Sequence, residues 1–189
     1  MDEGRFQSFK GHYLLAMPSL GDSNFGRSVV FLCDHRPDGA MGFVLTRHHD
    51  FLEAAEVFQE FDLEMAGVAA KTPVYDGGPV HQDEIFLLHG PPFGADGTYP
   101  LNEKVALSNS MKTLAMVGKG LGPLKVAIFL GSAGWGPGQL EAELSANAWL
   151  TLESSEDLIF EVPTQERWET ALHRLGVDPL LLSNDFGRA

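Results

Sequence analysis

Short hydrophobic runs alternate with turns that contain glycine or proline along most of the chain. Nearly continuous apolar runs of about four to eight residues are typical of strands that are buried on both faces. Two such runs flank Arg36-Pro37-Asp38-Gly39, where proline fixes φ and glycine permits a positive φ, so this segment predicts a β-hairpin. The pattern predicts strands at residues 12–17, 28–34, 40–45, 74–75, 84–89, 105–108, 124–130, 148–152 and 158–162.

Apolar residues also recur at the spacing of one helical face, which predicts amphipathic helices. Asp50 is the expected N-cap of the first helix, with Glu53 in the capping-box position, and Thr164 is the expected cap of the last. Pro137 suits the first turn of a helix, because its missing N–H is no loss there. We therefore predict helices at residues 51–62, 111–118, 137–147 and 165–175, an exposed loop at 90–102 and a glycine-rich turn at 131–138.

The order of these elements indicates the fold class. Strands and helices are interspersed, but tight turns join several neighbouring strands. This arrangement favours an α+β fold with a mixed or largely antiparallel sheet and flanking helices over a doubly wound parallel sheet. The sequence contains no internal repeat and no Ser-rich or Pro-rich linker. We therefore expect a single domain over residues 1–189, with residues 1–10 as a candidate flexible segment.

The charge of the chain narrows the range of partners. Its 26 acidic and 13 basic residues give a net charge of −13. Proteins that bind DNA or RNA gain affinity when Lys and Arg displace counterions from phosphates. The acidic surface therefore argues against nucleic acid as a partner, and the same repulsion argues against an anionic membrane.

Cysteine usage and the N-terminal sequence predict a cellular location. Cys33 is the only cysteine, so a disulfide within the chain is excluded and a reducing compartment is expected. Met1-Asp2-Glu3-Gly4 is acidic and lacks the basic and apolar regions of a signal peptide. No apolar stretch approaches the roughly 18 residues that span a bilayer. These features together predict a cytoplasmic protein.

Cys33 allows two interpretations. It alternates with Val29 and Phe31 along a predicted strand, so it shares a face with apolar residues and is expected to be a buried, inert thiol. The alternative is a reactive thiolate near Arg27 or near His35, because residues i and i+2 of a strand share a face. Cys33 and His35 are therefore the candidate catalytic residues.

Candidate ligand-binding residues come from segments that carry either flexible backbone or an anion-pairing side chain. Glycines before a helix can leave N–H groups free for phosphate or carboxylate, and an arginine fork can hold such a group with two donors. The alternative for both glycine segments is a tight structural turn, because the Lys-Ser/Thr ending of a P-loop is missing. The candidate residues are Asn24, Arg27, Gly77, Gly78, Gly134, Trp135 and Gly136.

Two further segments contain residue types that bind metals. They are His48-His49-Asp50 and His81-Gln82-Asp83-Glu84. Neither has the i, i+4 histidine spacing of a zincin helix, and the chain has no cysteine pair. We interpret both as solvated loops and assign no metal site and no cofactor.

Several segments in a fixed order resemble one known family. They are Gly11-His12-Tyr13-Leu14-Leu15-Ala16-Met17-Pro18-Ser19-Leu20, Asp22-Ser23-Asn24-Phe25, Arg27-Ser28-Val29-Val30, Cys33-Asp34-His35, Gly39-Ala40-Met41-Gly42, Gly77-Gly78-Pro79-Val80, Gly134-Trp135-Gly136-Pro137-Gly138-Gln139-Leu140-Glu141 and Asn147-Ala148-Trp149. The chain thus resembles the YqgE/AlgH family of bacterial proteins. The family ends in Gly-His-Ala, whereas this chain ends in Gly187-Arg188-Ala189, so no role of a terminal histidine carries over.

The resemblance implies a compact α+β fold with a mixed, partly barrel-like sheet and peripheral helices, in a bacterial cytoplasmic protein. Some members are labelled as transcriptional regulators, a label that describes a genetic effect and not contact with DNA. Since no complete catalytic set is visible, our leading hypothesis is a binding or regulatory protein that acts through a small ligand or a protein partner without direct DNA contact. One alternative is a thiol-based enzyme or redox sensor that uses Cys33. The other is a transcriptional regulator that binds DNA directly, although residues 178–182 contain no Lys or Arg with which to read it.

Overall fold

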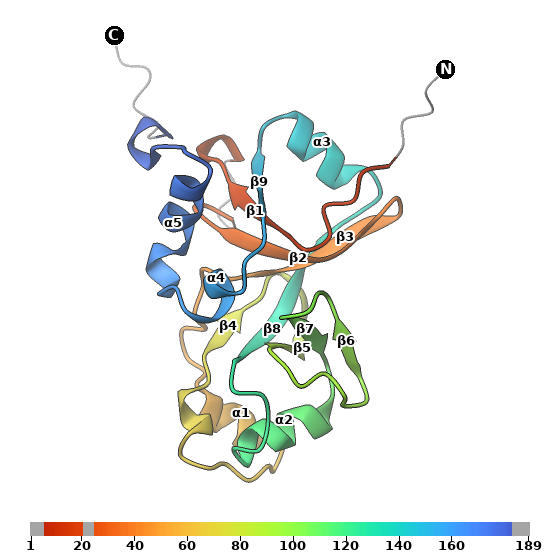
Figure 1. Cartoon of the computed structure of the whole chain (residues 1–189), viewed down its shortest axis with the longest axis vertical. Coiled ribbons are helices and arrows are strands. Elements are labelled where there is room, and N and C mark those ends of the chain that lie inside the picture. The colour runs from red at the N-terminus through yellow and green to blue at the C-terminus, as the bar shows by residue number, and fades with distance from the viewer. Residues whose placement is uncertain (1–5, 21–24, 183–189) are drawn as a thin grey trace.

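The computed structural model describes residues 6–20 and 25–182, which form one curled sheet with helices packed around it (Figure 1). The strands are β1 (His12–Ala16), β2 (Val29–Arg36), β3 (Gly39–Val44), β4 (Val74–Asp76), β5 (Val80–His89), β6 (Thr98–Pro100), β7 (Ala106–Ser108), β8 (Val126–Trp135) and β9 (Trp149–Glu153). The helices are α1 (Ala54–Glu60), α2 (Met111–Gly118), α3 (Gln139–Ser145), α4 (Asp157–Phe160) and α5 (Arg167–Arg174). Four 3-10 turns are η1 (Pro18–Leu20), η2 (Ala69–Lys71), η3 (Thr164–Glu166) and η4 (Pro179–Leu182).

The described strands follow the order β6-β7-β5-β8-β3-β2-β1-β9, with β4 beside β8. Among them β4 and β8 pair in parallel, and the other pairings are antiparallel. The strand β8 joins two groups of strands, because residues 126–130 pair with β4 and β5 whereas residues 133–135 pair with β3. The sheet curls between these groups (Figure 1). The predicted fold class, α+β with a mixed, largely antiparallel and partly barrel-like sheet, is confirmed.

In the described part of the chain three hydrophobic clusters form the core, and alternating strand residues contribute to different clusters. Tyr13 and Leu15 of β1 belong to the cluster that packs against α4 and α5, whereas Leu14 belongs to the cluster under α3. The third cluster lies against α1 and α2, which occupy the opposite end of the molecule from α3 in Figure 1. Within the described residues, no helix is long and apolar enough to cross a membrane.

Residues 158–162, predicted as a strand, instead form most of α4 and the turn after it. A five-residue apolar run does not distinguish a strand from a buried helical turn, so neighbouring contacts decide. Arg174 of α5 donates hydrogen bonds to Asp157 in the first turn of α4, which lowers the pKa of that carboxyl to about 2. A carboxylate at this end also suits the helix dipole.

Other predicted boundaries also differ from the structure. Thr164, the expected cap of the last helix, begins the turn η3, and the N-cap of α5 is Glu166. Residues 131–135 continue β8 instead of forming a turn, since Gly131 accommodates a φ of 68° and the close approach of the Gly78 carbonyl. The predicted loop 90–102 contains the short strand β6. The N-cap of α1 is Glu53 and not Asp50, because Glu53 forms the capping box with Glu56.

Candidate functional site

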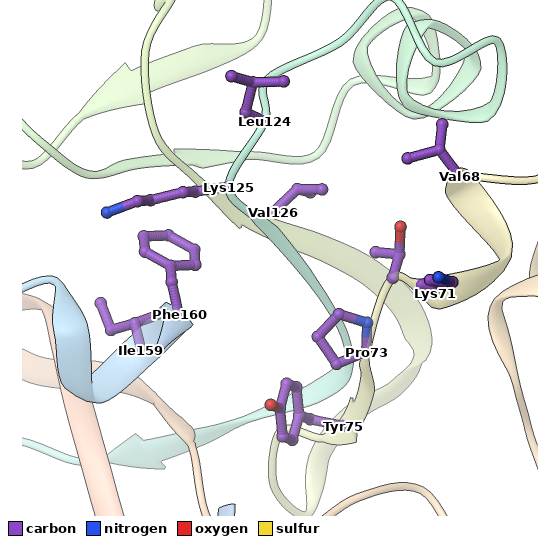
Figure 2. A pocket seen from close by; sticks show the side chains of 10 residues that line it. Val68, Lys71, Pro73, Tyr75, Leu124, Lys125, Val126, Ile159 and Phe160 are labelled. Atoms are coloured by element: carbon purple, nitrogen blue, oxygen red, sulfur yellow. The ribbon is translucent and has the colours of Figure 1, made fainter. Parts of the chain in front are cut away.

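A groove with a volume of about 290 Å³ opens between three segments that are far apart in the sequence (Figure 2). Residues 68–75 form one wall, residues 124–126 at the start of β8 form the second, and α4 forms the third. This volume lies near the lower end of the range for small-molecule sites. The lining residues are Val68, Lys71, Thr72, Pro73, Tyr75, Leu124, Lys125, Val126, Ile159 and Phe160.

Tyr75 supplies a buried aromatic ring to the groove, and its position is fixed from several directions. The ring stacks on Phe129 with centroids 5.1 Å apart and on His48 with centroids 4.7 Å apart. The Tyr75 hydroxyl accepts a hydrogen bond of 2.9 Å from Nη2 of Arg167, and it lies 3.4 Å from Oγ1 of Thr164. These contacts hold the ring in place before any ligand binds.

Arg167 fixes the α4 wall of the groove. Its side chain is buried, with the residue 3% exposed, and it donates to the carbonyl oxygens of Ile159 at 2.9 Å, of Val162 at 3.0 Å and of Leu45. Within the described chain no carboxylate pairs with the guanidinium, so carbonyl and hydroxyl dipoles stabilise the buried charge. No sequence pattern marks this residue, because a lone arginine on an amphipathic helix is usually a surface residue.

The charge of the groove differs from that of the whole molecule. Two lysines, Lys71 and Lys125, lie on opposite sides of the opening (Figure 2), and among its described lining residues none is acidic. The Lys125 amine lies 2.6 Å from the carboxylate of Glu161 and 3.3 Å from that of Glu156, and these hydrogen bonds raise its pKa. Lys71 makes no ion pair within the described residues.

Large apolar side chains are exposed at the rim of the groove. The exposed fraction is 101% for Leu124 and 67% for Val68, and both residues line the groove. Leu121, which is not among the lining residues, is 68% exposed. Clustered exposed apolar residues are typical of binding surfaces, whereas single ones are common anywhere on a protein.

The structure separates the two candidate catalytic residues. The β2–β3 register shifts between Leu32 and Asp34, which places a bulge at Cys33. Cys33 therefore packs with the cluster under α4 and α5, whereas His35 turns to the opposite face and contacts Glu141 of α3. The expectation that they share a strand face was wrong, because a bulge shifts the alternation by one residue.

The contacts of Cys33 and His35 are those of residues that hold the fold together. Cys33 is 3% exposed, and burial raises the pKa of its thiol, which disfavours the thiolate needed for reaction. Nδ1 of His35 accepts a hydrogen bond of 2.9 Å from the Phe9 backbone, and its Nε2 lies 3.0 Å from the Glu141 carboxylate. Residues 6–10, within the segment expected to be flexible, are thereby anchored to β2.

The first glycine segment packs against another part of the chain. A Cβ atom on Gly77 would lie 2.3 Å from the Gly131 carbonyl oxygen, and one on Gly78 would lie 2.5 Å from the backbone of Ser132. The φ angle of Gly78 is 142°, which also favours glycine. Both glycines therefore permit close contact with β8, and neither lines the groove.

The second glycine segment adjoins a closed aromatic cluster. Gly134 and Trp135 end β8, and the Gly136 backbone donates to the Gln139 side chain at 3.1 Å. The Trp135 indole donates to Oε2 of Glu143 at 2.9 Å and is 7% exposed. These three residues and the groove lie in different parts of the fold.

Arg27 lies at a small cleft, apart from the groove. Its guanidinium carbon is 5.4 Å from the centroid of the Trp168 ring, and a cavity of about 120 Å³ adjoins both side chains. Asn24, the remaining predicted ligand-binding residue, lies outside the described residues. Among the described residues, no three His, Cys, Asp or Glu side chains are grouped so that they could hold a metal ion.

Comparisons with known proteins agree with this architecture. A family model described as AlgH-like matches residues 13–180. A UPF0301 protein of Thioalkalivibrio sulfidiphilus is 42% identical over 182 residues, covering 96% of this chain and 97% of the relative. A UPF0301 protein of Bordetella avium is 41% identical over 189 residues, covering 100% and 95%.

Solved structures lead to the same conclusion. The solution structure of the AlgH protein from Pseudomonas aeruginosa superposes with a TM-score of 0.80 at 40% identity, and the match covers 100% of both chains. A crystal structure of a Corynebacterium diphtheriae protein shares the fold, with a TM-score of 0.72 at 22% identity over 90% of this chain and 88% of that one. The family match, the relatives and the shared fold together show that this chain belongs to the AlgH-like family.

Proposed function

We propose that this protein is a cytoplasmic binding protein, and not an enzyme, that recognises a small amphipathic anion through the groove in Figure 2. By amphipathic anion we mean an apolar chain or ring that carries one carboxylate or similar group. A regulatory effect on genes would then be indirect, without contact between this protein and DNA. The net charge of −13 supports this part of the proposal, because an acidic surface repels the dense negative charge along a DNA backbone.

One observation carries the proposal. On a chain with twice as many acidic as basic residues, the groove combines an apolar lining with two lysines and no acidic side chain among its described residues. The apolar lining, which includes Phe160, Ile159 and Pro73, would cover the chain of such a ligand. Lys71, which has no ion-pair partner in the described structure, would face its charged group.

The proposal is tested with octanoate as the probe, by NMR titration of the Leu124 methyl signals. Octanoate should bind, octanol should bind about two- to fivefold more weakly because it lacks the charge, and acetate should not bind measurably because it lacks the chain. The substitution Lys71→Gln should weaken octanoate binding by about two- to fivefold.

Lys112→Gln is the matched control, since it removes the same charge from α2 at a residue that does not line the groove. It should leave the octanoate affinity unchanged. The proposal fails if octanoate leaves the Leu124 signals unmoved, or if both lysine substitutions weaken binding equally.

A protein partner is the second candidate, and the exposed rim favours it. Val68, Leu121 and Leu124 together present apolar surface beyond what a small ligand in the groove would cover. The substitution Leu121→Ser distinguishes the two candidates. It should leave octanoate binding unchanged, whereas it should weaken capture of a protein that covers the rim.

A further inference from the structure

The cleft beside Arg27 has a polar character that the groove lacks. Its lining comes from the loop before β2, from the bend after β3, and from η3 and α5. The lining residues are Arg27, Thr46, Thr164, Gln165, Trp168 and Glu169. Its volume of about 120 Å³ accommodates a few water molecules or one compact ion.

Arg27 lies beside this cleft, against an aromatic ring. Its guanidinium lies over the indole of Trp168, a residue that is 5% exposed and is itself fixed by a 3.0 Å hydrogen bond from Nε1 to the Ala16 carbonyl. Within the described residues Arg27 makes no ion pair, and its backbone has a φ of 53°, which is costly for a residue with a side chain. Stacking on an aromatic ring limits the rotamers of the guanidinium, so less entropy is lost when its N–H groups bind an anion.

Two more donors face the same cleft. Thr46 accepts a hydrogen bond of 3.3 Å from the Val29 backbone through its hydroxyl oxygen, which leaves its own proton available. The Gln165 side chain is exposed and carries two N–H donors. Thr164 completes the wall, and its hydroxyl is positioned 2.8 Å from Nε2 of His48.

The number and the positions of these donors indicate which class of ligand fits the cleft. A carboxylate offers two oxygens, which the fork of a single arginine already satisfies, whereas a tetrahedral oxyanion offers three or four oxygens in different directions. Donors at Arg27, Thr46 and Gln165 come from three separate segments. We propose that the Arg27 cleft is a binding site for a tetrahedral oxyanion, either free phosphate or the phosphate group of a small metabolite. This site is separate from the groove and does not depend on its ligand.

Glu169 is the feature of the cleft that opposes an anion. Its carboxylate lines the cavity, and it makes no ion pair with Arg27 in the described structure. Its repulsion limits affinity without blocking the site, because the side chain is exposed and water screens the charge. The substitution Glu169→Gln should therefore tighten oxyanion binding by about two- to fivefold.

The test is an NMR titration of the Trp168 indole N–H with inorganic phosphate and, separately, with glycerol phosphate. Chloride at matched ionic strength is the reference. We expect saturable shifts with at least one phosphate compound. Arg27→Gln should weaken that binding by about tenfold or more, because charge-assisted hydrogen bonds are lost. Tighter binding of inorganic phosphate would indicate a free ion, and tighter binding of glycerol phosphate would indicate a metabolite.

The controls keep this test decisive. Arg27 is exposed, so Arg27→Gln should unfold at the temperature of the wild type, and Lys112→Gln should bind phosphate as the wild type does. The proposal is overturned if neither compound shifts the Trp168 signal beyond the chloride reference. It is also overturned if Arg27→Gln and Lys112→Gln bind equally well, because net charge alone would then explain the binding.

Discussion

Two aromatic regions of the molecule differ in whether their polar groups have partners within the chain. At the α3 end, Trp135 and Trp149 both donate to Oε2 of Glu143, at 2.9 and 2.7 Å, and Gln139 donates to the other oxygen at 2.9 Å. Their rings pack edge to face, and Phe25 lies against both. This Trp cluster is closed on itself, because its polar groups find partners within the chain.

The groove at Tyr75 differs, because one of its charged groups has no ion-pair partner among the described residues. Its Tyr75 ring is fixed by Arg167, but Lys71 lacks an ion-pair partner in the described structure and Leu124 is exposed. The Trp cluster adjoins Gly134 and Gly136, which with Trp135 were candidate ligand-binding residues in the sequence, whereas no sequence motif marks the groove. Satisfied polar groups therefore distinguish a structural cluster from a candidate site better than residue types do.

We expect the largest loss of stability from a substitution of Glu143, which joins the two indoles of the Trp cluster. In Glu143→Ala, both buried indole N–H groups lose their acceptor, and we expect unfolding to become easier by about 2–4 kcal/mol. Urea unfolding, followed by tryptophan fluorescence, measures this change. Glu143→Gln is the matched control, because its amide oxygen can still accept from both indoles, so its loss should be clearly smaller. Equal losses in the two variants would mean that the indole hydrogen bonds do not hold the cluster together.

The pH dependence of stability tests whether Cys33 is buried as a protonated thiol. Burial raises the pKa of its thiol in the folded state, so its contribution to stability is complete below the unfolded pKa, roughly 8.5, and is lost as the pH rises above it. Between pH 8 and pH 10 the wild type should lose about 2 kcal/mol more stability than Cys33→Ala. Urea unfolding at several pH values measures the difference.

A thiol that ionises in the folded state would contradict this expectation. The wild type and Cys33→Ala would then lose stability in parallel across the same pH range. Such a result, together with alkylation of Cys33 in the folded protein near neutral pH, would revive the hypothesis of a thiol enzyme or redox sensor. Tyr13, whose pKa burial also raises, is present in both proteins and cancels in the comparison.

Local patterns predicted much of the fold. The hairpin at residues 36–39 could be predicted because the residues that favour its turn are neighbours in the sequence. The structure pairs Arg36 with Gly39, as expected. The errors arose where a distant contact decided the outcome. Residues 158–162 become helical beside Arg174 and Arg167, and the bulge at Cys33 depends on pairing with β3. Neither partner is visible in the local sequence.

The groove could not be predicted for a related reason. Its walls meet because β4 pairs in parallel with β8 and because Arg167 holds α4 against Tyr75. The strands β4 and β8 lie about 50 positions apart in the sequence, and Arg167 and Tyr75 lie 92 apart, so no short motif spans the groove. Arg27 was visible as an anion-pairing residue, whereas its support by Trp168 required the fold.

We expect the smallest change in stability at Leu124, which belongs to the groove and not to the Trp cluster. Because the side chain is fully exposed, Leu124→Ser removes no buried surface and should change the free energy of unfolding by less than about 0.5 kcal/mol. It should nevertheless weaken octanoate binding, since Leu124 lines the groove, whereas Leu121→Ser should change neither quantity. Urea unfolding measures stability, and an octanoate titration followed at the methyl signals of Ile159, which also lines the groove and is unchanged in both variants, measures binding. A loss of more than about 1 kcal/mol in Leu124→Ser would mean that this side chain is covered in solution, and the groove would then be occupied by part of the protein itself or by a second copy of it.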